Sequence, residues 1–105
     1  MTQTELIALI KSRINIHLDR DHASIGVSVP FMVINTEQTD NVAADNGVYL
    51  EKNSVTLDLY CEKIDPVLEQ PIKNLLFEIG TGWMRTEEYL DDEKTWLVEY
   101  TFDIL

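Results

Sequence analysis

From Trp96 to Ile104, every second residue of this 105-residue chain is large and apolar, and this alternation constrains the fold more than any other feature. Glu99, Thr101 and Asp103 lie between the apolar positions. A period of two residues is typical of a β-strand with one buried and one solvated face. The segment 95–104 is therefore predicted to be a strand that packs its apolar face on a core.

Three other segments also predict strands. The stretch from Val29 to Ile34 begins one, with Pro30 at its start or on an edge, because proline donates no ladder hydrogen bond. Residues 55–61 repeat the two-residue alternation. Residues 83–90 are expected to form a hairpin with 95–104 around the turn 91–94. The residues of 55–61 that should face the core are Val55, Leu57, Leu59 and Cys61.

Two helices are predicted from apolar spacing and from capping residues. Thr4 is expected to cap a helix from about Glu5 to about Ile16, followed by a polar connection. Asp65 and Pro66 predict the start of the second helix, since proline at the first helical position loses no hydrogen bond. Its apolar stripe comprises Leu68, Ile72, Leu75, Leu76 and Ile79, and Gly80-Thr81-Gly82 should end it.

The predicted order of elements is α-β-β-α-β-β, with two helices packed against an antiparallel sheet. Because the helices are segregated from the hairpins, the expected class is α+β. No linker or internal repeat divides the chain, so residues 1–105 are expected to form a single domain.

The segment 35–47 is too polar for a buried strand and longer than an ordinary hairpin turn. We expect a long loop that ends in a tight turn at Asn46-Gly47. Loops of this length are either disordered excursions or functional surfaces, and exposed hydrogen-bonding groups suit protein contacts. The candidate interface residues of this loop are Thr36, Glu37, Asp40, Asn41, Asp45 and Asn46.

The formal charge of −11, from 19 acidic and 8 basic residues, argues against a direct grip on nucleic-acid phosphates. Such binding needs clustered Lys or Arg side chains, and the sequence has no basic cluster. Acidic residues crowd the predicted hairpin near its turn. Glu87, Glu88, Asp91 and Asp92 are therefore the second candidate interface. A Ca²⁺ or Mg²⁺ site there is disfavoured, because no glycine permits the sharp turn that such loops use.

No catalytic, cofactor or metal site is expected, and the chain is not predicted to be an enzyme. His17 and His22 flank two aspartates, but their spacing matches no familiar metal signature. Cys61 is expected to act as a small apolar core residue. As the only cysteine it cannot form an intramolecular disulfide, which fits a reducing compartment. Neither a signal peptide nor a membrane span is indicated.

Several short runs resemble the small tail-completion proteins of long-tailed phages and prophages, which are also called tail terminator or head–tail joining proteins. The resemblance covers about the last three quarters of the chain. The runs are Pro30-Phe31-Met32-Val33, Ala44-Asp45-Asn46-Gly47-Val48-Tyr49, Val55-Thr56-Leu57-Asp58-Leu59-Tyr60, Lys63-Ile64-Asp65-Pro66-Val67-Leu68-Glu69, Glu88-Tyr89 and Tyr100.

This resemblance implies an α+β subunit that forms a ring, typically a hexamer, on the completed tail tube. The implied partners are other copies of the chain, the tail-tube protein and the head connector. DNA would pass through the ring without specific binding, since acidic side chains lining a channel repel it. The implied location is the host bacterial cytoplasm during assembly and then the neck of the virion.

Two alternatives remain open from the residues alone. Acidic residues are in excess in the C-terminal part of the chain. This excess is compatible with an acidic protein-binding module or with a DNA mimic that occupies the basic cleft of a nucleic-acid-binding protein. Carboxylates on a sheet can imitate phosphates. A metal-dependent hydrolase is the weaker alternative.

Overall fold

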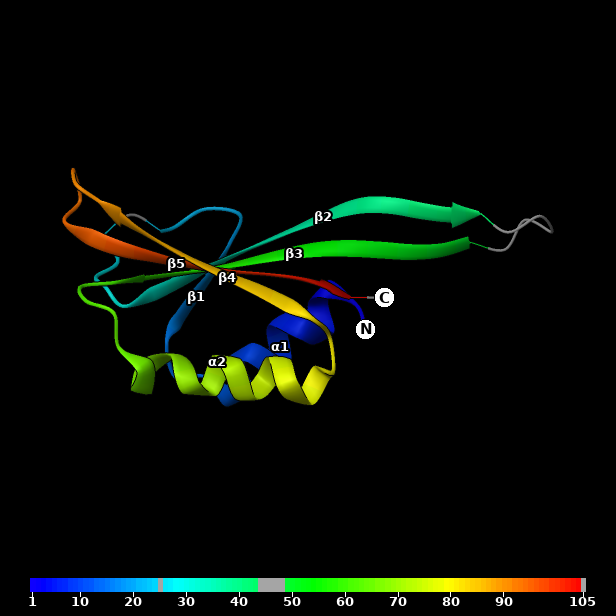
Figure 1. The fold of residues 1–105 in the computed structure, drawn as a ribbon, viewed down its shortest axis with the longest axis horizontal. Coiled ribbons are helices and arrows are strands. Elements are labelled where there is room, and N and C mark those ends of the chain that lie inside the picture. Colours follow the sequence, from blue (N-terminus) through cyan, green and yellow to red (C-terminus); the bar gives the residue numbers. More distant parts are fainter. Residues whose placement is uncertain (25, 44–48, 105) are drawn as a thin grey trace.

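The computed structural model describes residues 1–24, 26–43 and 49–104 (Figure 1), and for residues 38–43 and 49–52 it describes the backbone only. Two helices and five strands make up this part of the chain. In order they are α1 (Gln3–Arg13), β1 (His17–Arg20), β2 (Phe31–Ala43), β3 (Tyr49–Cys61), α2 (Pro66–Ile79), β4 (Trp83–Leu90) and β5 (Thr95–Ile104).

The five strands form one mixed sheet in the order β1-β2-β3-β5-β4. β1 pairs with β2 in parallel, and all other pairs are antiparallel. The α+β class is confirmed, but the predicted order α-β-β-α-β-β and the all-antiparallel sheet are wrong. The segment 17–20, interpreted from sequence as part of a polar connection, is β1, and only its Leu18 is buried.

Both helices cover the same face of the sheet (Figure 1). The strand register explains why the helices cover this face. Leu57 pairs with Ile34 on one side and with Tyr100 on the other, so all three apolar side chains point to the same face of the sheet. These residues pack with the apolar stripes of α1 and α2 into one core. The predicted inward positions Val55, Leu57, Leu59 and Cys61 are confirmed as buried.

The ends of α2 are confirmed, whereas those of α1 are not. The Asp65 carboxylate accepts a hydrogen bond from the backbone N–H of Val67, and Gly80 ends α2 in the left-handed conformation that glycine favours. The cap of α1 is Thr2 and not Thr4. Thr2 Oγ1 accepts a hydrogen bond from the Glu5 N–H at 3.1 Å, and the Thr2 hydroxyl donates to the Glu5 carboxylate at 3.1 Å.

Residues 35–43, predicted to be part of a long loop, are strand instead, because β2 continues to Ala43, and β3 begins at Tyr49. The predicted tight turn at Asn46-Gly47 lies outside the described residues. β3 pairs with β5 only from Asn53 onward. Residues 40–43 and 49–52 therefore pair only with each other among the described residues. We call this two-stranded ribbon the arm. It projects beyond the rest of the sheet (Figure 1) and accounts for the elongated shape, 52 × 26 × 22 Å.

Candidate functional site

The structure places the first group of predicted interface residues along β2 and the arm. Thr36 and Glu37 precede the arm, and Glu37 is exposed. Thr36 is half-buried, and within the described part of the chain its buried Oγ1 has no hydrogen-bond partner. Asp40 and Asn41 belong to the arm. The remaining two predicted residues, Asp45 and Asn46, lie outside the described residues.

The second group lies at the other end of the molecule. Glu87 and Glu88 are exposed residues of β4, and Asp91 and Asp92 are exposed in the turn to β5. This turn and the arm lie at opposite ends of the long axis (Figure 1). The structure therefore does not bring the two predicted surfaces together. They lie at two separate ends of the described chain.

A third surface, which the sequence interpretation missed, is the free edge of β4. In the part of the chain that the structure describes, β4 pairs only with β5, so its other side presents unpaired backbone groups. Met84 is 71% exposed on this strand, and Trp83 and Tyr89 are also exposed. On the neighbouring helix, Phe77 is 87% and Val67 is 81% exposed. Both lie off the apolar stripe of α2. Apolar residues outside this stripe were the sequence signal from which an exposed apolar surface could have been predicted.

A buried ionic network fixes β4 to α2. Glu69 of α2 is only 2% exposed, and its carboxylate accepts hydrogen bonds from Arg85 Nε at 2.7 Å and Arg85 Nη2 at 3.0 Å. The Tyr100 hydroxyl of β5 also donates to Glu69, and Arg85 reaches Glu87 at 3.0 Å. The donors satisfy a charge that would otherwise be costly to bury.

The network sets the protonation state of its members. Burial by itself would raise the pKa of Glu69, but the hydrogen bonds from Arg85 and Tyr100 outweigh burial and lower it. The hydrogen bond to Glu69 raises the pKa of Arg85, and burial followed by Glu69 raises that of Tyr100. All three groups therefore keep their usual charge states at neutral pH, which suits a structural role better than proton transfer.

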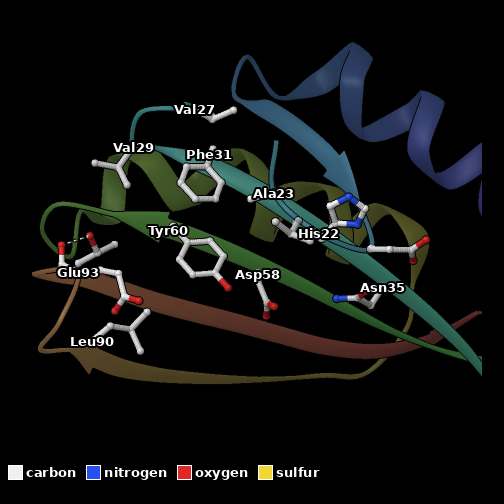
Figure 2. Close-up of a pocket in the computed structure, with 13 residues that line it drawn as sticks. His22, Ala23, Val27, Val29, Phe31, Asn35, Asp58, Tyr60, Leu90 and Glu93 are labelled. Carbon is white, nitrogen blue, oxygen red and sulfur yellow. Dashed lines mark hydrogen bonds between the residues drawn. The ribbon is translucent and has the colours of Figure 1, made fainter. Parts of the chain in front are cut away.

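The face of the sheet that the helices leave open carries a pocket of about 610 Å³ (Figure 2). Residues of the connection between β1 and β2 and the end of the β4–β5 hairpin border it. Phe31 of β2 and Tyr60 of β3 form its aromatic wall, with ring centroids 4.8 Å apart and planes 17° from parallel. This pocket could not be predicted from the sequence, because it forms only where the connection between β1 and β2 lies over the sheet.

Asp58 and Glu99 sit on this open face as direct partners across β3 and β5. The Asp58 Oδ1 atom is buried and has no hydrogen-bond partner among the residues that the structure describes. Burial, and then the hydrogen bond and charge of Glu99, raise the pKa of Asp58 to about 7. Burial and the charges of both acids also raise the pKa of the Tyr60 hydroxyl. Two carboxyl groups this close cannot both ionise without cost.

Other candidate chemistry has a structural explanation. His17 Nε2 lies 2.9 Å from the Asp19 carboxylate, which also accepts hydrogen bonds from the backbone N–H and hydroxyl of Ser24. Cys61 is buried, and burial raises its thiol pKa, as expected for a core residue. Among the residues that the structure describes, no group of three or more His, Cys, Asp or Glu side chains is arranged to hold a metal ion.

No helix within the described ranges is both long enough and apolar enough to cross a membrane. Neither a protein-family model nor a curated protein sequence matches this chain.

Proposed function

We propose that this protein is a structural assembly protein of a long-tailed phage or prophage, which forms a ring on the tail tube and joins the tail to the head connector. The sequence resemblance to tail-completion proteins suggests this role. The observation that carries the proposal is the presence, on one chain, of a projecting arm and a free β4 edge with exposed apolar side chains.

A closed ring needs two different patches on each subunit, because each copy meets one neighbour with one surface and the other neighbour with a second. The β4 edge offers unpaired backbone groups beside exposed Met84 and Trp83. The arm offers a two-stranded ribbon, which has little independent stability in water and gains from packing on another surface. The two surfaces are therefore suited to contact different neighbours.

The electrostatics are compatible with a ring through which DNA passes. Each copy in a ring adds a net charge of −11. Exposed carboxylates at the β4–β5 turn would repel phosphates wherever they line a channel. Passage without binding is the behaviour expected of a neck component.

The test measures mass and shape together. Light scattering after size-exclusion chromatography, across a wide concentration range, should show a multiple of the 12.1 kDa chain mass, with or without added tail tubes. Electron microscopy of the same samples should show rings, alone or at tube ends. A protein that stays monomeric at all concentrations and never binds tubes would contradict the proposal.

The exposed acids of the β4–β5 turn favour a second candidate, an acidic module that binds a basic protein cleft. Asp91, Asp92 and Glu93 are all exposed there. Such a complex would weaken steeply with salt. Neutralising Glu87, Glu88, Asp91 and Asp92 together should abolish it, and unchanged affinity for a basic partner would exclude this candidate.

A further inference from the structure

The pocket on the open sheet face combines apolar walls with an acidic floor. Val29, Phe31 and Leu90 supply apolar side chains, and Figure 2 shows Phe31, Tyr60 and Asp58 beside one another between the connection and the hairpin end. The stacked rings of Phe31 and Tyr60 lead to the Asp58 carboxyl. An elongated ligand with an apolar stem and a polar end fits a pocket whose lining changes in this way from apolar to acidic.

The floor lacks a cation of its own. Asp58 Oδ1 is buried without a hydrogen-bond partner, and Glu99 lies directly across from Asp58. Asp21 and Glu93 add carboxylates to the lining, and no lysine or arginine is among the described residues that line the pocket. Asp58 lines the pocket and has a second acid as its cross-strand neighbour, so a cation from outside would relieve the repulsion between the two carboxyl groups.

We propose that this pocket binds an arginine side chain presented by a partner protein. Its methylene stem lies along the Phe31 and Tyr60 rings, and its guanidinium donates hydrogen bonds to Asp58 and neutralises the Asp58–Glu99 pair. Guanidinium groups suit this position because they stack on aromatic rings and pair with carboxylates through two donors.

The pocket fits this ligand better than a metal ion or a nucleic acid. Hard cations need six or more converging oxygens, whereas the walls here are mostly apolar side chains. Nucleic-acid phosphates would face only negative charge. The inference goes beyond the proposed ring and does not depend on it, since one folded subunit contains the whole pocket.

The experiment titrates the full chain with N-acetyl-arginine amide at neutral pH and follows backbone amide signals by NMR. N-acetyl-citrulline amide, which has nearly the same shape and no charge, is the matched ligand control. Signals of residues lining the pocket should shift and saturate with the arginine probe, and binding of citrulline should be at least about tenfold weaker, as expected for loss of a charge-assisted hydrogen bond.

Two variants locate the contact. Asp58→Asn keeps the side-chain shape and should weaken arginine binding about tenfold. Glu5→Gln removes the same charge from exposed α1, on the helix side of the sheet, and its amide oxygen can still accept from the Thr2 hydroxyl, so it should leave binding unchanged. Equal affinity for both probes, shifts spread over the surface, or full binding by Asp58→Asn would overturn the proposal. Because the ligand comparison uses the natural chain, the test holds even if a variant fails to fold, and its result is separate from ring formation.

Discussion

Arg85 of the edge strand β4 and Glu69 of α2 form an ion pair with two hydrogen bonds, which joins the sheet to the helix packed on it. The carboxylate is 2% exposed, whereas a quarter of the Arg85 side chain, 24%, reaches solvent. The pair is therefore asymmetric. Loss of the cation leaves a buried anion, but loss of the anion leaves a cation that still contacts water and Glu87.

We predict that Arg85→Met destabilises the fold by about 3 kcal/mol, the usual cost of leaving a buried charge without its partner. Glu69→Gln should cost only about 1 kcal/mol, because the amide oxygen still accepts from Tyr100. Urea denaturation of each variant measures the free energy of unfolding. The double variant should lose less than the sum of the two single variants. Equal costs for the two single variants would contradict the asymmetry.

The Asp58–Glu99 pair predicts a fall in stability with rising pH. The folded pKa of Asp58, about 7, lies above its unfolded value, so the folded state holds a proton that the unfolded state has released. The stabilisation from this bound proton is complete at pH values below the pKa of Asp58 in the unfolded chain. It is lost as the pH rises through the folded pKa of about 7.

Asp58→Asn should remove that dependence and, after allowance for solvent screening, be more stable than the natural chain by about 1 kcal/mol at pH 8. Denaturation midpoints at pH 5, 6, 7 and 8 give the comparison. Asp92→Asn removes an exposed charge of the turn and serves as the matched control. Parallel pH profiles for the natural chain and Asp58→Asn would show that the pair does not titrate as described.

The free edge of β4 predicts an assembly-specific effect of Met84→Lys. Met84 is 71% exposed, so the folded subunit should change in stability by no more than about 0.5 kcal/mol. A lysine on an exposed edge opposes strand pairing between chains, so rings should weaken or disappear. Light scattering reports the mass. Ala8→Lys adds the same charge on exposed α1 and should leave rings intact.

The arm should be dispensable for folding and required for assembly. Replacing residues 39–52 by Asn-Gly joins Gln38 to its partner Asn53 through a tight two-residue turn. The free energy of unfolding should change by no more than about 1 kcal/mol, because a shorter hairpin loop closes with little entropic cost. Circular dichroism and denaturation check the fold, and light scattering checks the mass. Rings formed by this variant would remove the arm from the proposed interface.

Cys61 should be inert to thiol reagents in the folded protein. Its side chain is buried and burial raises its pKa, so little thiolate is available. A chromogenic disulfide reagent should label it only at the rate at which the chain unfolds, and labelling should accelerate in urea. Fast labelling in buffer would indicate an exposed and activated thiol.

The parts of the fold that were predictable from sequence have strong local signals. The bounds of β4 and β5 agree with the predicted segments 83–90 and 95–104, because alternation and a polar turn define both strands. The start of α2 was marked by Asp65-Pro66 and its end by Gly80. In these segments local preference and tertiary packing favour the same structure.

The parts that were missed depend on distant pairing. β1 has four residues and buries only Leu18, and its parallel partner β2 lies beyond a polar connection. Residues 40–43 of the arm were interpreted as part of a loop because they are too polar for a buried strand. A ribbon that projects beyond the sheet does not need apolar side chains. Neither feature is visible in the periodicity of its own segment.

The candidate surfaces were predicted only in part. The acidic turn was identified correctly as exposed, but the Phe31–Tyr60 pocket required knowledge of which residues lie across from each other. Glu69 carried a signal that was not used. It shares the helical spacing of the buried Ile72 and Leu76, and an acid at a core position implies a buried cation such as Arg85.

The position of β2 and β3 inside the sheet has a mechanical consequence. Their inner halves are flanked by β1 and β5, so the arm is continuous with strands that are hydrogen-bonded on both sides. A pull on the arm along its axis loads many of these bonds in shear at once, since they run across the strands. Tension on the arm would therefore pass into the centre of the sheet without peeling away an outer strand.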